Sequence, residues 1–256
     1  MQDLFTPEGE AALAAVVRLR PLLAFDFDGT LAPIVAQPAD ARIAAPLARR
    51  LATLAARLPV AIVTGRAIVD VRSRLGFEPR FVVGHHGADD ARDADGAARR
   101  RAALDTLRGA LQARQPALAA AGIVIEDKGQ SLALHYRRAR HRAQARDLTL
   151  ELLSPHGADL QVFGGKMVVN VMPAGAPDKA SAVHDLVRRC AVPAALFAGD
   201  DVNDEPVFRA APAHWLTLRV GRGGPPSAAR FCLDGPRDML RLVERIETLH
   251  DRLEAG

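Results

Sequence analysis

The sequence has little of what marks several common protein classes. Only two of its 256 residues are cysteine, and 4% are aromatic, with one Trp and one Tyr. Cys190 and Cys232 lie far apart without metal-ligand spacing, which favours free thiols in a reducing compartment. The shortage of aromatic side chains argues against a stacking surface for nucleic acid. No apolar run reaches roughly 18 residues and no signal-peptide pattern is present, so we expect a cytoplasmic protein with no nucleic-acid or membrane partner.

The overall composition is that of an ordinary globular protein. Hydrophobic residues make up 49% of the chain and charged residues 25%, with a formal net charge of +4. The length suits one large domain, or a core with a smaller inserted domain. A sequence pI of about 9.6 weakly indicates an anionic ligand. We expect a monomer or a weak homo-oligomer.

The first informative stretch is an apolar run that ends in carboxylates. Residues 22–25 follow a proline and read as a strand buried on both faces, and Asp26 and Asp28 come directly after it. Open α/β sheets bind their ligands at the carboxyl ends of such strands. Asp26 is a candidate nucleophile towards phosphorus, and Asp28 a candidate general acid and base. The alternative is a strand that runs into an acidic surface turn.

A second acidic stretch follows another apolar run. Residues 194–198 predict a buried strand, and the loop after it carries Asp200, Asp201, Asp204 and Glu205. Oxygen ligands with no neighbouring Cys or His cluster are typical of Mg²⁺. The alternative is an acidic helix start, which the helix dipole would favour. The two acidic stretches together favour a Mg²⁺ site.

Two further positions suit the binding of a phosphate. Thr64 and Gly65 follow the predicted strand at 60–63, where a hydroxyl and backbone amides can hold phosphate oxygens. Thr64 as a helix N-cap is the alternative. Lys179 begins a predicted helix, where its charge opposes the dipole, and this indicates a role in neutralising a phosphoryl group and a carboxylate. A solvated lysine is the alternative.

The order of the predicted elements divides the chain into two domains. Strands and helices alternate through residues 1–89 and again through 174–256, which predicts a doubly wound, Rossmann-like parallel sheet of the α/β class. Between them, in residues 90–173, strands come in consecutive pairs with helices between the pairs. This pattern predicts an inserted α+β domain, whose helices we expect near 98–113 and from Arg140 to Leu153.

Four motifs occur in a fixed order: Asp26-Phe27-Asp28-Gly29-Thr30, Thr64-Gly65-Arg66, Lys179, and Gly199-Asp200-Asp201-Val202-Asn203-Asp204. This order resembles the haloacid dehalogenase superfamily of phosphatases. The resemblance implies that Asp26 is the nucleophile, that Asp28 is the acid and base, and that the insertion is a C2-type cap. Thr64 and Lys179 would bind phosphate. The implied ligands of Mg²⁺ are Asp26, the carbonyl of Asp28 and Asp200, with Asp201 or Asp204 in support.

Further motifs in both predicted domains carry a closer resemblance: residues 28–34, Gly84-His85-His86-Gly87-Ala88, Glu126-Asp127-Lys128-Gly129, 132–137 and 199–205. Together they resemble the trehalose-6-phosphate phosphatase family, which implies Mg²⁺-dependent hydrolysis of trehalose 6-phosphate through an aspartyl-phosphate. The substrate-binding residues that this resemblance implies are Gly65, Arg66, His86, Glu126, Lys128, Arg137, Lys166 and Asn170.

The sequence differs from the family pattern at two positions, and two other functions remain as alternatives. The family usually has glutamate four residues after the cap lysine, whereas Lys166 is followed at that spacing by Asn170, which alters the hydrogen-bonding group offered to a sugar. Ala180 replaces the glycine expected after Lys179. Asn170 keeps open a phosphatase for another sugar phosphate, such as sucrose phosphate or mannosyl phosphoglycerate. A regulatory module that binds sugar phosphate without turnover is the rival from another class, and the presence of all the acids argues against it.

The residues of the predicted insertion are less informative by themselves. Glu126 and Lys128 also fit a solvated surface pair. Residues 135–137 fit an exposed strand end, and residues 138–142 fit a solvated basic face. Their assignment to sugar binding therefore depends on the resemblance.

Overall fold

The computed structural model describes residues 1–87, 94–129 and 131–255, and these form two compact units. The first, which we call the core unit, consists of Met1–Gly87 and Pro177–Gly256. The second, the insert unit, consists of Ala88–Ala176. The core unit therefore contains two chain segments that are distant in sequence.

The core unit is built on a parallel sheet of seven strands within the described residues, in the order β1-β11-β10-β9-β2-β3-β4. The strands are β1 (Gln2–Asp3), β2 (Leu22–Phe25), β3 (Val60–Val63), β4 (Phe81–Val83), β9 (Ala195–Gly199), β10 (Leu216–Val220) and β11 (Phe231–Leu233).

The middle of this sheet is where the chain changes direction across it. From β2 the chain adds β3 and β4 on one side, whereas β9, β10 and β11 lie on the other. Phe25 of β2 pairs with Ala198 of β9 and with Ile62 of β3. β2, β3 and β9 are buried throughout, as their apolar sequences require. The crevice at such a switch point is the usual ligand site of doubly wound sheets.

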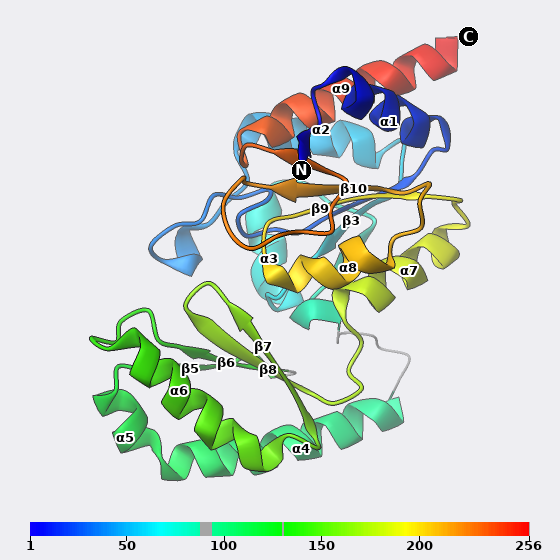
Figure 1. Cartoon of the computed structure of the whole chain (residues 1–256). Helices are drawn as coiled ribbons and strands as arrows, with labels where there is room; N and C mark the ends of the chain where they lie inside the picture. Colours follow the sequence, from blue (N-terminus) through cyan, green and yellow to red (C-terminus); the bar gives the residue numbers. More distant parts are fainter. Residues whose placement is uncertain (88–93, 130, 256) are drawn as a thin grey trace. The chain divides into compact units, whose positions relative to one another are not determined.

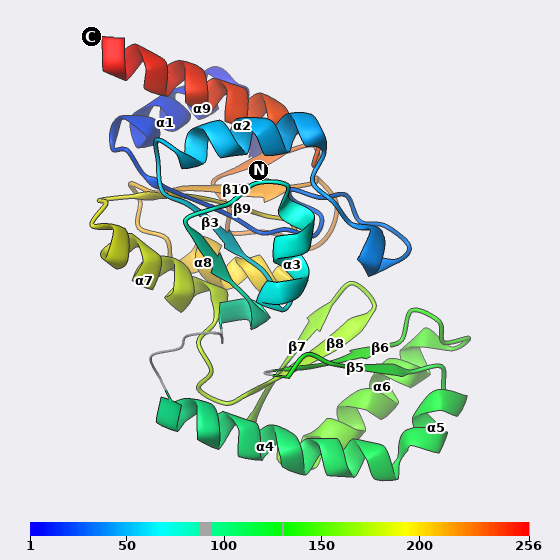
Figure 2. The ribbon, with the colours of Figure 1, turned by 180° about the vertical axis from the view of Figure 1, so that it is seen from behind.

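Helices cover both faces of the core sheet, with α1, α2 and α9 on one face and α7 and α8 on the other (Figures 1 and 2). Their apolar residues face the sheet at helical spacing, as Leu47, Leu51 and Leu54 do in α2. The helices of this unit are α1 (Pro7–Arg18), η1 (Pro38–Asp40), α2 (Ala45–Ala55), α3 (Ile68–Leu75), η2 (His85–Gly87), α7 (Lys179–Cys190), η4 (Val202–Asp204), α8 (Glu205–Ala210) and α9 (Asp238–Ala255).

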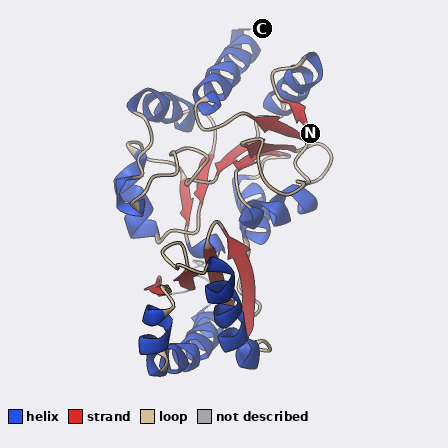
Figure 3. Ribbon diagram, turned by 60° about the vertical axis from the view of Figure 1, so that its left-hand side comes forward, coloured by secondary structure: helices blue, strands red, loops and turns tan. Residues whose placement is uncertain are grey.

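The insert unit has an antiparallel sheet of four strands within the described residues, in the order β5-β6-β8-β7, and its helices lie on one face (Figure 3). Leu104 and Leu107 of α4 pack with Leu132 and Leu134 of β6 in its hydrophobic core. The elements are α4 (Ala94–Ala113), α5 (Gln115–Ala120), β5 (Val124–Asp127), β6 (Leu132–His135), α6 (Arg142–Leu153), η3 (Ser154–His156), β7 (Leu160–Gly165) and β8 (Val168–Pro173).

The predicted fold class is confirmed, with differences in detail. The sequence did not predict β1, which has only two residues, or α5, which begins at Gln115 directly before a proline. The predicted basic helix begins at Arg142 and leaves Arg140 outside. In the parts of the chain that the structure describes, no helix is both long and apolar enough to cross a membrane.

Candidate active site

Three buried carboxylates meet at the carboxyl end of the core sheet. Asp26 follows β2, Asp200 follows β9, and Asp204 ends the short helix η4 after β9. One carboxylate oxygen of each lies within 4.8 Å of the others. Asp204 is fully buried, and Asp26 and Asp200 are each 5% exposed. The two adjacent strands at the switch point thus bring Asp26 together with two acids that are far from it in the sequence.

Lys179 places a positive charge between two of these acids. Its Nζ donates to Oδ1 of Asp26 and to Oδ1 of Asp204, both at 2.7 Å. Asp178 caps α7 by accepting a hydrogen bond from the Ser181 amide at 2.8 Å, and α7 packs against β2 and β3. Lys179 is only 4% exposed, which excludes the solvated lysine considered from the sequence.

The cluster contains three carboxylates and, from Lys179, one ammonium group that contacts two of them. Burial raises the pKa of Asp26 well above its ordinary value; Lys179 opposes this shift, while Asp204 and Asp200 add to it. Burial would lower the pKa of Lys179, but attraction to Asp204 and Asp26 raises it above the usual range, so the lysine is charged. A cation bound at the cluster would favour the ionised form of these carboxylates.

The residues present fit Mg²⁺. All three groups are carboxylates, the hard oxygen ligands that this ion prefers. Two glycines make room for them: a Cβ on Gly29, whose φ is +84°, would come within 2.0 Å of Oδ2 of Asp200. A Cβ on Gly199 would come within 2.3 Å of Cγ of Asp204. Side chains at either position would displace a carboxylate from the cluster.

Asp201 is used differently from its neighbours. Its carboxylate accepts a hydrogen bond from the Val202 amide at 2.8 Å and begins η4. In turn, the Asp201 amide donates a hydrogen bond to Oδ2 of Asp204 at 3.0 Å. This capping box fixes Asp204 in the cluster. The loop therefore contains both the acidic helix start and the carboxylate cluster that the sequence offered as alternatives.

Asp28 is held by an arginine fork. Nε of Arg66 donates to Oδ2 of Asp28 at 2.6 Å, and Nη2 donates to Oδ1 at 2.7 Å. The same guanidinium donates to Asp70 at 2.8 Å and to the Pro38 carbonyl at 2.9 Å. Burial would lower the pKa of Arg66, but its hydrogen bonds to Asp28 and Asp70 raise it. The fork therefore links the acid to the loop that contains η1.

Thr64, Gly65 and His86 form a third part of the site. Thr64 is buried after β3, and its Oγ1 accepts a hydrogen bond from the Arg66 amide at 3.2 Å. The N-cap of α3 is Ala67, so Thr64 does not cap that helix. The ring of His86 lies so close to Gly65 that a Cβ there would come within 2.3 Å of its Cε1. His85 and His86 both have positive φ, 50° and 58°, and such strain is concentrated at functional sites.

In the insert unit, several predicted residues share the sheet face opposite the helices. Glu126 pairs with Ala133, and Ala133 pairs with Asn170, so these positions lie in one row on one face. Oε2 of Glu126 lies 2.8 Å from Nε2 of His135 and 3.8 Å from Nζ of Lys128. Arg137 is exposed after β6, and Lys166 is exposed in the turn between β7 and β8.

Comparison with known proteins identifies the family. The sequence model of the family described as trehalose-phosphatase matches residues 24–215, which is most of the chain. The chain belongs to the trehalose-phosphatase family. A trehalose-phosphate phosphatase of Mycolicibacterium paratuberculosis is 35% identical over 254 residues, covering 92% of this chain and 63% of that protein. The chain thus spans less than two thirds of the length of this curated relative.

Solved structures agree with this family. The Aspergillus fumigatus trehalose-6-phosphate phosphatase has a TM-score of 0.63 and 28% identity, covering 95% of this chain and 97% of that one. The C-terminal domain of the C. albicans trehalose-6-phosphate phosphatase has a TM-score of 0.75 at 22% identity, covering 94% and 97%. The second similarity shows the fold alone.

Some residues of this trehalose-phosphatase family member contact the site although the sequence analysis did not assign them to it. Asp70 shares Arg66 with Asp28; it lies in the first turn of α3, four residues after Arg66, which precedes the helix. His135 contacts Glu126, and its place in the alternating run Leu132-Ala133-Leu134-His135 puts it on the same face. The contact between Arg66 and Asp28, 38 residues apart, had no signal in the sequence.

Proposed function

We propose that this chain is a Mg²⁺-dependent phosphatase that hydrolyses trehalose 6-phosphate to trehalose and phosphate, in the cytoplasm and in trehalose biosynthesis. The observation that carries the proposal is Asp26, buried at the carboxyl end of β2 beside Lys179 and two further carboxylates, in a member of the trehalose-phosphatase family. The free thiols of Cys190 and Cys232 agree with a reducing compartment.

The proposed reaction has two displacements at phosphorus. A carboxylate oxygen of Asp26 attacks in line and the bond between phosphorus and the sugar oxygen breaks. Asp28, which must be protonated for this step, gives that oxygen its proton and becomes the carboxylate. Asp28 then takes a proton from water, whose oxygen attacks phosphorus and releases phosphate from Asp26. Lys179 offsets charge on the phosphoryl oxygens and opposes the rise in the pKa of Asp26 that burial causes.

Two groups of residues would prepare this reaction. Asp26, Asp200, Asp204 and the Asp28 carbonyl would hold Mg²⁺, which when bound supplies positive charge against the phosphate oxygens. Thr64 and the amides of Gly65 and Arg66 would bind those oxygens, with His86 packed against Gly65 to keep this loop in place. Asp201 would support the site through Asp204.

We propose that the insertion at residues 90–173 is a cap that selects the sugar. Glu126, Lys128 and Asn170 share one face of its sheet, and Arg137 and Lys166 lie in turns at the ends of its strands. These donors and acceptors match a polyhydroxylated ligand. Asn170, at the position where the family usually has glutamate, favours a second candidate, a phosphatase for another disaccharide or sugar phosphate.

Replacement of the nucleophile tests the proposed reaction. We expect Asp26→Asn to lower kcat on trehalose 6-phosphate by at least about 1,000-fold, because an amide oxygen does not form the phosphoryl intermediate. Circular dichroism and thermal unfolding should show an intact fold. Asp201→Asn is the matched control, because its carboxylate caps η4, and we expect a much smaller loss. Near-normal turnover by Asp26→Asn would disprove the nucleophile assignment.

A substrate panel tests the choice of sugar. Initial rates on trehalose 6-phosphate, sucrose 6-phosphate, glucose 6-phosphate and mannosyl phosphoglycerate, each with Mg²⁺ and with EDTA, separate the two candidates. We expect the highest kcat/KM on trehalose 6-phosphate and loss of activity with EDTA. A clear preference for another sugar would transfer the proposal to that substrate.

A further inference from the structure

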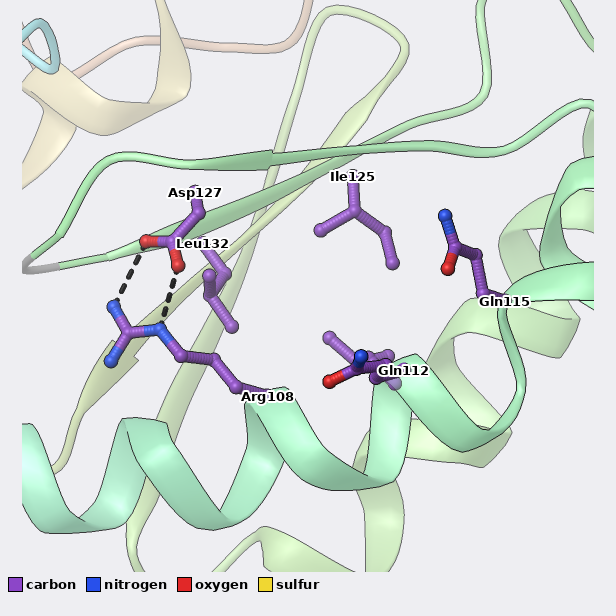
Figure 4. Close-up of a pocket in the computed structure, with 7 residues that line it drawn as sticks. Arg108, Gln112, Gln115, Ile125, Asp127 and Leu132 are labelled. Carbon is purple, nitrogen blue, oxygen red and sulfur yellow. Dashed lines mark hydrogen bonds and ion pairs between the residues drawn. The ribbon is translucent and has the colours of Figure 1, made fainter.

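A side chain of α4 holds the turn that follows β5. Nε of Arg108 donates to Oδ2 of Asp127 at 2.7 Å, and Nη2 donates to Oδ1 at 2.9 Å (Figure 4). Nη2 also donates to the carbonyl of Gly129 at 2.7 Å. One guanidinium therefore contacts both the last residue of β5 and the turn two residues later, in a planar fork that lysine cannot reproduce.

The turn is further closed by its own hydrogen bonds. Oδ1 of Asp127 accepts from the Gly129 amide at 2.8 Å, and the Lys128 amide donates to the Ser131 carbonyl at 2.9 Å. The hydrogen bond from Arg108 lowers the pKa of Asp127, so the pair is ionised near neutral pH. Gly129 has φ +82°, which suits the tight turn.

Because side chains alternate between the two faces of a strand, the contact between Arg108 and Asp127 also affects the neighbouring residues on the opposite face. Asp127 pairs with Leu132, which packs with the leucines of α4, so Asp127 lies on the helix-covered face. Glu126 pairs with Ala133 and lies on the other face, as strand geometry requires. Lys128 reaches back to Glu126 at 3.8 Å. The residue held by Arg108 is thus flanked by two proposed sugar-binding residues.

The cavity beside Arg108 does not explain the arginine as a ligand-binding group. This cavity has a volume of about 190 Å³ and is lined in part by Gln112, Gln115 and Ile125 (Figure 4). Nε and Nη2 of Arg108 donate to Asp127 and Gly129, and Nη1 donates to Asp105 at 2.7 Å. Two carboxylates already neutralise its charge, so an anion in the cavity would gain little from it.

We propose that Arg108 and Asp127 are positioning residues for sugar recognition, acting from the helix-covered face of the insert sheet. By fixing the turn after β5, they hold Glu126 and Lys128 in the arrangement that binds the sugar. The inference rests on the proposed function, because it assigns these two residues to the sugar part of the substrate. It assigns no part of the phosphoryl chemistry to Arg108.

The test compares the sugar substrate with one that has no sugar. We expect Arg108→Ala and Asp127→Ala each to raise KM for trehalose 6-phosphate by about 5- to 10-fold, with kcat little changed. Their kcat/KM on p-nitrophenyl phosphate should equal that of the unaltered protein. Arg108→Lys should recover only part of the loss. Arg146→Ala, at an exposed arginine of α6, is the control and should leave KM and kcat unchanged on both substrates.

The double variant decides whether the two residues act together. If both act through one turn, Arg108→Ala with Asp127→Ala raises KM no more than the larger single change. A KM increase that equals the product of the two single increases, or an unchanged KM in Arg108→Ala, would overturn the inference. Asp127→Asn, which keeps the shape of the side chain, replaces Asp127→Ala if that variant does not fold.

Hydrogen exchange separates this inference from the proposed function. In Arg108→Ala, amides of residues 124–129 should exchange faster, while those of β2 and β9 keep their rates. If the unaltered protein does not hydrolyse trehalose 6-phosphate, the proposed function fails, and the KM comparison is made with the best sugar phosphate of the panel. Unchanged exchange in residues 124–129 would overturn the positioning role in either case.

Discussion

The two sheets of this protein carry their polar groups in different places. In the core unit, β2, β3 and β9 are buried along their length, and the acids follow the last strand residues. In the insert unit, polar side chains alternate with apolar ones along the strands, so Glu126 and Asn170 lie on a sheet face. The first arrangement buries charge and surrounds it with packed side chains. In the second, the charged Glu126 is exposed, whereas the neutral Asn170 is buried.

This difference predicts different consequences of mutation. A buried charge in the core is balanced by specific partners, so its removal affects both folding and chemistry. A partly exposed charge in the insert sheet is solvated when unpaired, so its removal affects ligand binding with little cost in stability. The comparison would fail if removal of a buried charge in the core changed only KM, or if removal of an exposed charge in the insert sheet unfolded the protein.

The largest stability effect is expected at Lys179. Lys179→Met leaves Asp26, Asp200 and Asp204 together without the buried ammonium that donates to two of them. We expect a loss of about 3–5 kcal/mol in the free energy of unfolding, together with loss of turnover. Urea unfolding measures the first, and initial rates on trehalose 6-phosphate measure the second.

The matched control is the same substitution in the insert unit. Lys166 is exposed between β7 and β8, so Lys166→Met should keep the stability of the unaltered protein within about 0.5 kcal/mol. Equal stability losses at the two lysines would show that burial does not distinguish the two units.

The same difference explains how much of the molecule was predictable from its sequence. Apolar runs that end in acids stand out, so the core strands, the parallel sheet and the meeting of Asp26 with Asp200 could be predicted from the sequence. Parallel strands have their carboxyl ends at one edge, and this rule needs no knowledge of side-chain packing. The fork between Arg66 and Asp28 depends on how a loop turns back, which no local pattern specifies.

In the insert unit the deciding information is strand register. Glu126 and Asp127 are adjacent acids, and the sequence does not say which faces the helices until β5 is paired with β6. Arg108 belongs to a helix with several arginines, so nothing marked it before Asp127 was placed against it. In this unit the resemblance to the family indicated candidate residues for sugar binding, and only the strand pairing showed which residues lie beside them.

The next largest effect is expected on substrate binding at Glu126. Glu126→Gln keeps the size of the side chain but removes the charge that faces His135 and Lys128. We expect KM for trehalose 6-phosphate to rise about 10-fold, the equivalent of about 1.4 kcal/mol, with unchanged stability in urea. Glu151→Gln, an exposed glutamate on α6, should leave KM unchanged. A fall in kcat on p-nitrophenyl phosphate would instead place Glu126 in the phosphoryl chemistry.

The smallest effect is a pH dependence of stability that belongs to the core unit. His250 on α9 is 1% exposed, and burial lowers its pKa below the ordinary value near 6.5, with repulsion from Arg57 adding to the shift and Glu254, 3.4 Å away, opposing it. Below that pH the unfolded chain takes up a proton that the folded chain does not. The stability contributed by neutral His250 is therefore complete at pH 7.5 and is lost as the pH falls below 6.5, by at most about 1.4 kcal/mol per pH unit.

Urea unfolding at pH 7.5 and 5.5 should show a smaller pH-dependent loss in His250→Gln than in the unaltered protein, whereas His141→Gln, at an exposed histidine before α6, should keep the full loss. Equal losses in all three proteins would mean that His250 accepts its proton in the folded state as readily as in the unfolded chain.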